Sequence, residues 1–362
     1  MLRALEEDRA RVADIEAQIR VLEHSISVLR AQKALVQERL DSYTYPVLTL
    51  PNEITSEIFI HFLPTYPLYP PLTGLLSPNL LAQICRTWRE IALATPALWS
   101  AISLSFYSRH YKQESHISQM WLDRSGCRPL SIKIFTDGIY TPSRPLEVIG
   151  PVNSQRARWE YLKLVLSQSF TFILEGPMPT LRQLDFELEY SDPPVDFIAC
   201  AASRVMLPWS QLTALTLQMV YLRECVPILQ QTPNLMYCKL DLVLDPEPDV
   251  LPEVRLPLLE SLILNDDGEP ILGYLDTFVV PALRHLEIPE LELGKNPTDT
   301  LSSFVSKSGC KLQDLRITGL LSIIRDVREY RRAFPSISKL SLDGWYLLEH
   351  EEKEISEVDE LA

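Results

Sequence analysis

The chain has 362 residues, of which 34 are Lys or Arg and 48 are Asp or Glu, so its formal net charge is −14 at pH 7. An acidic chain is a poor general binder of nucleic acid, because such binding depends on neutralising phosphates with cations. We find no apolar run of about eighteen residues, so we expect no membrane-spanning helix and no membrane partner. The N-terminal stretch is charged throughout, unlike a signal peptide.

The six cysteines are spread along the chain and form no CxxC pair. They are Cys85, Cys127, Cys200, Cys225, Cys238 and Cys310. We therefore expect buried free thiols in a reducing compartment, the cytoplasm or the nucleus. The chain also has no Asn-x-Ser/Thr sequon without Pro, which agrees with that compartment.

Residues 1–42 carry a heptad pattern that predicts a long coiled-coil helix. Position a holds Leu5, Val12, Ile19, Ile26 and Leu40, and position d holds Ile15, Leu22, Leu29 and Val36. Lys33 at a and Asp8 at d are the polar exceptions. β-Branched residues at a with Leu at d favour a parallel two-stranded coil, and so a homodimer. The alternative is a single helix that packs against its own domain.

Residues 46–104 predict three short helices, each with Pro in or next to its first turn. The first spans Leu50–Phe59 and continues its apolar face to Phe62. The second begins at Ser77-Pro78, and the third begins at Thr95-Pro96. The second helix carries apolar residues at helical spacing: Leu81, Ile84, Cys85, Trp88 and Ile91.

These fragments, in this order, resemble the fungal form of the F-box. The resemblance is carried by LPNEITSEIF from Leu50, by ICRTWREIA from Ile84 and by TPALW from Thr95. It implies that the helices bind a Skp-type adaptor, and through it a cullin. The residues that it places on the adaptor-binding surface are Leu50, Pro51, Ile54, Ile58, Leu81, Ile84 and Trp88. The alternative role for each is packing inside the module. The connection Pro64–Pro78 is longer than the usual one, and we expect it to loop out.

A motif of the form L-x-x-L-x-L recurs over the next part of the chain, assigned to residues 105–348. It starts at Trp159, Leu181, Leu212, Leu235, Leu259, Leu283, Leu312 and Ile337, with weaker copies at Trp99 and Cys127. From Trp159 the starts lie 22 to 31 residues apart. Alternation puts the apolar residues on one face of a short strand, which stacking of the units can bury. An ordinary α/β domain with similar strands is the alternative.

This region resembles a degenerate leucine-rich repeat array, in which the Asn or Cys expected after each strand is mostly missing. Helical return segments are predicted at Phe197–Val205, Cys225–Gln231, Thr298–Ser308 and Ile323–Phe334. The expected fold class is therefore α+β to α/β: a long helix, a three-helix F-box-like module and a repeat solenoid. Residues 349–362 hold seven acidic residues and predict a solvated acidic tail.

We find no pattern that indicates catalysis. The six His residues lack metal-ligand spacing, and neither a Gly-rich phosphate loop nor a nucleophile elbow can be traced. We therefore expect a non-enzymatic chain without cofactor or metal.

By resemblance, this layout is that of the substrate-recognition subunit of a Skp–cullin–F-box ubiquitin ligase. A target protein would bind the outward residues of the repeat strands, chiefly Tyr237, Lys239, Asp241, His285, Glu287 and Arg316, with Tyr161, Lys163, Asp185, Glu187 and Lys339 on the same face. Their mixed charge leaves the class of target open. The alternative is a coiled-coil dimeric scaffold for protein interactions that is not coupled to ubiquitination.

Overall fold

The computed structural model describes residues 2–43, 46–105, 111–135, 145–166, 176–188, 207–245, 251–266, 273–319 and 327–343. The predicted acidic tail and the predicted helix Phe197–Val205 lie outside these residues. The chain divides into two compact units, Met1–Glu57 and Ile58–Ala362.

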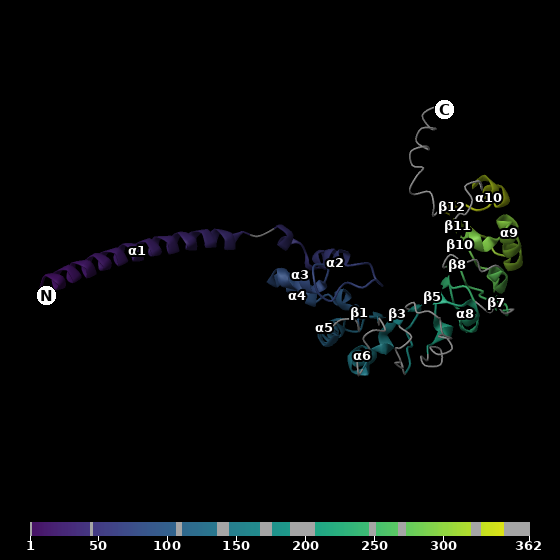
Figure 1. Ribbon diagram of the computed structural model, residues 1–362, viewed down its shortest axis with the longest axis horizontal. Coiled ribbons are helices and arrows are strands. Elements are labelled where there is room, and N and C mark those ends of the chain that lie inside the picture. The colour runs from purple at the N-terminus through teal and green to yellow at the C-terminus, as the bar shows by residue number, and fades with distance from the viewer. Residues whose placement is uncertain are drawn as a thin grey trace, which may run out of the picture. The chain divides into compact units, whose positions relative to one another are not determined.

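The first unit is dominated by one continuous helix, α1 (Leu2–Ser42), of 41 residues (Figure 1). This confirms the predicted long N-terminal helix. Neither Gly nor Pro interrupts it before Pro46, where the short 3-10 helix η1 (Pro46–Thr49) follows. The next helix, α2 (Asn52–Phe62), begins directly after Pro51, whose missing N–H costs nothing at a helix start.

Three short helices precede the sheet in the second unit: α3 (Pro78–Ile84), α4 (Arg86–Leu93) and the 3-10 helix η2 (Pro96–Trp99). Ser77 caps α3, since its side chain accepts a hydrogen bond from the Asn79 N–H. The prediction of a single helix over α3 and α4 was wrong. Cys85 is extended (φ −152°, ψ 172°), and its Sγ accepts a hydrogen bond from the Trp88 N–H at 3.4 Å, so it begins a new helix.

The Pro-rich connection between α2 and α3 packs against the rest of the second unit. Leu72 has 9% of its surface exposed and belongs to the hydrophobic core. Its carbonyl accepts hydrogen bonds from the Ser77 hydroxyl and the Asn79 side-chain amide, both at 3.0 Å. The expectation that Pro64–Pro78 loops out was therefore wrong.

The rest of the second unit is built on a ten-stranded parallel sheet. Its order is β1-β2-β3-β4-β5-β6-β8-β10-β11-β12, so neighbours in the sheet follow one another along the chain. The strands are β1 (Ala101–Ser105), β2 (Leu130–Phe135), β3 (Trp159–Leu166), β4 (Gln183–Leu188), β5 (Ala214–Val220), β6 (Tyr237–Leu242), β8 (Ser261–Asp266), β10 (His285–Pro289), β11 (Asp314–Thr318) and β12 (Lys339–Asp343). Every copy of the L-x-x-L-x-L motif thus forms a strand, and the fold is of the α/β type.

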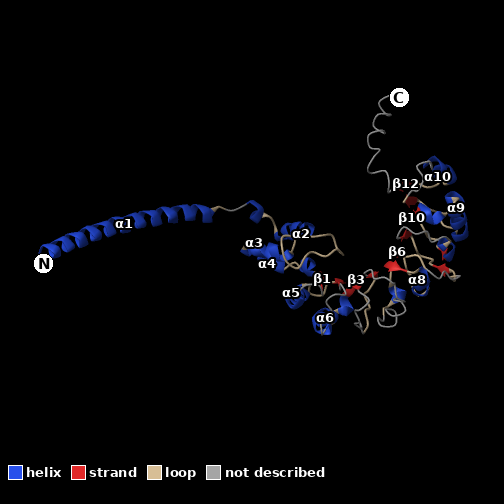
Figure 2. Cartoon of the chain, in the orientation of Figure 1, coloured by secondary structure: helices blue, strands red, loops and turns tan. Residues whose placement is uncertain are grey.

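Helices connect the strands. They are α5 (Tyr111–Arg124), α6 (Pro145–Asn153), α8 (Leu222–Leu229), α9 (Pro297–Ser308) and α10 (Val327–Ala333), with 3-10 helices η3 (Arg156–Arg158), η4 (Trp209–Gln211), η5 (Tyr274–Thr277) and η6 (Glu290–Leu293). Figures 1 and 2 show the α-helices along one side of the sheet. Three of the predicted return helices are confirmed, as α8, α9 and α10. A separate two-stranded ladder, β7 (Val254–Arg255) with β9 (Phe278–Val279), was not predicted.

The motif leucines form the core between the sheet and the helices. Leu215 and Leu262 are fully buried, and Trp121 of α5 and Phe304 of α9 belong to the same cluster. Burying one such side chain contributes about 1.5–3 kcal/mol, so the alternation of the motif determines which face packs.

The five cysteines that the structure describes are free. Cys225, Cys238 and Cys310 are buried as expected, but Cys127 is exposed and Cys85 is half-buried, so burial was predicted wrongly for these two. None of the helices described here is long and apolar enough to cross a membrane.

Candidate functional site

The outward side chains of the parallel strands form one continuous polar face. Because the register is unbroken across most pairs, residues of equal phase lie in rows that cross the sheet. One row, from β3 to β12, contains Tyr161, Gln183, Ala214, Tyr237, Ser261, His285, Asp314 and Lys339. The next contains Lys163, Asp185, Thr216, Lys239, Ile263, Glu287, Arg316 and Ser341. We call this surface the polar face.

All six predicted target-binding residues lie on the polar face. The two rows contain Tyr237, Lys239, His285, Glu287 and Arg316. Asp241 is the next outward residue after Lys239 on β6. Arg316 is exposed, whereas the other five are half-buried by their neighbours. The prediction of these positions rested on the period of two alone.

Asp185 is the centre of a hydrogen-bond network on β3, β4 and β5. Its Oδ2 accepts from Lys163 Nζ at 2.8 Å and from the Tyr161 hydroxyl at 3.3 Å, and its Oδ1 accepts from Gln218 Nε2 at 3.1 Å. Lys163 also lies 3.2 Å from a Glu187 oxygen. Burial alone would lower the pKa of Lys163, but the two carboxylates outweigh it and raise that pKa.

Charges alternate along the remainder of the polar face. Asn265 donates to Asp241 at 2.6 Å, and Lys239 lies 3.8 Å from the same carboxylate. The Asp314 carboxylate lies between His285 at 3.3 Å and Lys339 at 3.1 Å. Opposite charges thus lie close together, within β6 for Lys239 and Asp241 and on neighbouring strands for Asp314. A partner protein would have to match this pattern rather than a patch of one sign.

The Pro-rich connection covers the polar face at β2 and β3. The Tyr69 hydroxyl donates to the Ile132 carbonyl at 3.3 Å, and its ring centroid lies 6.1 Å from that of Tyr161. The Ser131 hydroxyl donates to the Pro67 carbonyl at 2.7 Å. Burial raises the pKa of both tyrosines, and the neighbouring Asp185 raises them further. No pattern in the sequence indicated this contact.

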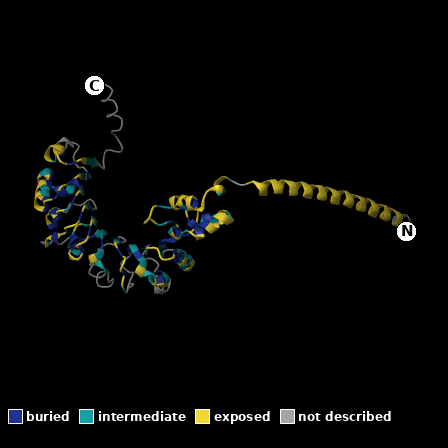
Figure 3. Ribbon diagram, turned by 180° about the vertical axis from the view of Figure 1, so that it is seen from behind, coloured by how far each residue is buried: buried dark blue, intermediate teal, exposed yellow. Residues whose placement is uncertain are grey.

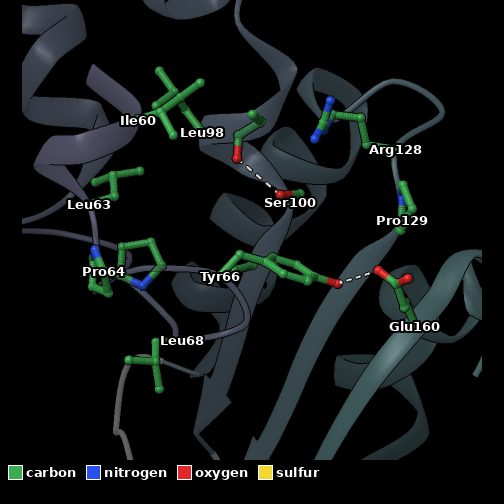
Figure 4. A pocket seen from close by; sticks show the side chains of 13 residues that line it. Ile60, Leu63, Pro64, Tyr66, Leu68, Leu98, Ser100, Arg128, Pro129 and Glu160 are labelled. Atoms are coloured by element: carbon green, nitrogen blue, oxygen red, sulfur yellow. Dashed lines mark hydrogen bonds between the residues drawn. The ribbon is translucent and has the colours of Figure 1, made fainter. Parts of the chain in front are cut away.

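A cavity of about 370 Å³ lies beside this connection (Figure 4). Apolar side chains such as Ile60, Leu63 and Leu98 line one side, and Arg128 and Glu160 lie on the other. The Tyr66 hydroxyl reaches across and donates to a Glu160 oxygen at 3.1 Å. This hydrogen bond fixes the connection beside the start of β3.

The residues predicted to bind an adaptor differ in exposure. In the first unit Ile54 has 51% of its surface exposed and Leu50 has 37%, and Pro51 is also exposed. In the second unit Ile58 has 49% exposed and Ile84 has 54%. These are large apolar side chains in contact with water, as a protein-binding surface requires.

Leu81 and Trp88 serve internal packing to a greater degree. Leu81 has only 4% exposed and belongs to the core cluster, so its side chain is not available to a partner. The Trp88 ring is half-buried and packs edge-on against Phe59, with ring centroids 5.0 Å apart. Of the seven predicted adaptor-binding residues, the exposed ones are therefore Leu50, Pro51, Ile54, Ile58 and Ile84.

In the part of the chain that the structure describes, no three side chains of His, Cys, Asp or Glu converge as metal ligands would. Gln218, Asn265 and Asp314 belong to the polar face but were not predicted as binding residues. The same period of two would have found them. Neither a protein-family model nor a curated protein matches the chain.

Proposed function

We propose that this chain is the substrate-recognition subunit of a Skp–cullin–F-box type ubiquitin ligase. Helices α2 to α4 bind a Skp-type adaptor, and the strands, as a degenerate leucine-rich repeat solenoid, bind a target protein on the polar face. A recruited conjugating enzyme carries out the ligation chemistry. The proposal places the chain in the cytoplasm or the nucleus.

The observation that carries the proposal is the pairing of two different surfaces in one chain. The helices expose isolated large apolar side chains, which suit a hydrophobic interface with an adaptor. The polar face instead presents ordered side chains with mixed charge over the eight sheet strands from β3 to β12, which suits selective recognition of one protein. A substrate receptor needs both kinds of surface.

The Pro-rich connection narrows the target-binding region. Tyr69 and Pro67 already occupy the polar face at β2 and β3. The predicted target-binding residues begin at Tyr237 on β6, three strands beyond the covered strand β3, and extend to Arg316 on β11. We therefore assign target binding to the stretch from β6 to β12.

The adaptor surface is tested by replacing one exposed side chain. The chain is co-expressed with a Skp-type adaptor, and its affinity for the adaptor is measured for wild type, Ile58→Ala and Leu258→Ala. Ile58 and Leu258 each have 49% of their surface exposed, but only Ile58 lies on the F-box-like helices. Loss of an anchoring contact of about 1–3 kcal/mol should weaken binding about 5- to 150-fold for Ile58→Ala.

The Leu258→Ala variant should bind like wild type, and both variants should keep the wild-type circular dichroism spectrum. Equal affinity for all three proteins would show that Ile58 is not part of an adaptor surface.

A scaffold that is not coupled to ubiquitination is the second candidate. The exposed 41-residue helix α1 favours it, because such a helix suits assembly with another chain. Co-purification with the adaptor separates the two functions, since the scaffold needs no adaptor.

A further inference from the structure

Helix α1 exposes an apolar seam that two charged residues, Asp8 and Lys33, interrupt. Every side chain from Leu5 to Ser42 is exposed, and the seam residues have between 47% and 63% of their surface in water (Figure 3). The seam consists of Leu5, Val12, Ile15, Ile19, Leu22, Ile26, Leu29, Val36 and Leu40. Spacing of alternately three and four residues is that of a two-stranded coiled coil. The occupant that fits the seam is therefore a helix with the same repeat.

The two polar residues in the seam determine which direction that helix can run. In a parallel dimer each residue meets its own copy, so Asp8 would face Asp8 and Lys33 would face Lys33. Both layers would then bring like charges together between apolar layers, where water screens them least.

An antiparallel dimer removes this conflict, because each a position then meets a d position. With the helix ends aligned, Lys33 of each copy lies opposite Asp8 of the other. The neighbouring layers stay apolar on both sides: Leu5 with Val36, Val12 with Leu29, Ile15 with Ile26, and Ile19 with Leu22. The β-branched residues at a favour the parallel direction. The charged layers oppose that direction more strongly, because like charges between apolar layers are costly.

The flanking charges act the other way but more weakly. The antiparallel arrangement places Arg9 beside Arg30 and Glu16 beside Glu23, whereas the parallel one pairs Arg11 with Glu16. These side chains remain in water at the edge of the seam, where one pair changes an equilibrium constant by less than about fivefold. A charge pair inside the seam outweighs them.

We propose that α1 binds a second copy of this chain as an antiparallel coiled coil, with Lys33 and Asp8 as the charge pair that sets direction and register. Val21, Val28 and Leu35 lie outside the seam and stay exposed at its edge. At about 1.5 Å per residue, the two Ser42 ends lie about 60 Å apart. A parallel dimer would hold them side by side.

Charge exchange between the two positions tests the direction. Dimer dissociation of the full chain is measured by sedimentation for wild type, Asp8→Lys, Lys33→Asp and the double variant. Each single change opposes like charges in both polar layers, so the dissociation constant should rise about tenfold or more. The double variant restores opposite charges and should return to within about threefold of wild type.

The parallel arrangement gives a different result for the same four proteins. Each change there replaces one like-charge layer by another, so the singles and the double would all resemble wild type. That result would overturn the proposal, as would a monomer, a trimer or a tetramer for the wild type at tens of micromolar.

A disulfide test gives an independent readout. The full chain carrying Val12→Cys and Leu29→Cys is oxidised, and its cross-linked peptides are identified by mass spectrometry. The antiparallel dimer joins position 12 to position 29 of the second copy. Links from 12 to 12 and from 29 to 29 would contradict it.

Discussion

At the scale of single residues, Asp185 holds the polar face together between β3 and β5. Only 14% of its side chain is exposed, and it accepts hydrogen bonds from three side chains on two neighbouring strands. Glu187, with 35% exposed, has one partner in common with it, Lys163. The two carboxylates therefore form a matched pair that differs in burial and in number of partners.

We predict that Asp185→Ala lowers the free energy of unfolding by about 1–3 kcal/mol, because Tyr161 and Gln218 lose their acceptor and Lys163 keeps only Glu187. Glu187→Ala should cost less than about 1 kcal/mol, since Lys163 keeps Asp185. Urea unfolding of both variants measures the difference. Equal losses would mean that the network on β4 does not depend on Asp185.

Three tyrosines at the contact between the Pro-rich connection and β3 predict a fall in stability at alkaline pH. Burial, reinforced by nearby carboxylates, raises the pKa of Tyr66, Tyr69 and Tyr161 above the usual value of 10.0. Above pH 10 the folded chain therefore keeps protons that the unfolded chain loses, and stability decreases as the pH rises. The contribution is fully present below pH 10.

Tyr69→Phe should flatten this decrease, since it removes one of the three groups. Unfolding free energies at pH values of about 9 and 11 measure the slopes. The same slope in wild type and Tyr69→Phe would contradict the assigned burial.

At the scale of elements, alternation in sequence predicted the strands and their register. Leu215 and Leu262 are fully buried, while the adjacent Thr216 and Ile263 are half-exposed on the polar face. Such a pattern suffices because a strand has only two faces, and an apolar motif selects the one that is covered.

We predict that Leu215→Asp and Leu262→Asp each remove the cooperative unfolding transition seen at the wild-type melting temperature, because each buries an unpaired charge. Thr216→Asp and Ile263→Asp should lower the melting temperature far less. Calorimetry measures the melting temperatures of the four variants. Equal decreases in melting temperature at inward and outward positions would refute the register.

Other elements could not be predicted because tertiary contacts determine them. The composition of Pro64–Pro78 indicates a loop, but the hydroxyls of Tyr66, Tyr69 and Ser131 hold it against the sheet. The break at Cys85 depends on one extended residue within an otherwise helical spacing. Leu81 shows that apolar periodicity cannot separate a buried residue from one that binds a partner.

At the scale of the whole molecule, the proposed binding surfaces lie on three separate parts of the described chain. Helix α1 offers a seam for a second copy, the helices after Pro51 offer apolar anchors, and the strands offer the polar face. Each part can be disabled without touching the others, because their residues do not overlap. Adaptor binding, self-association and target binding should therefore fail separately.

The central claim is that this chain binds a Skp-type adaptor. The most direct test is calorimetric titration of the purified 362-residue chain with purified adaptor. We predict saturable binding of one adaptor per chain with a Kd of about 1 μM or tighter, as expected for a stable interface. Absence of binding at adaptor concentrations of about 100 μM would contradict the account.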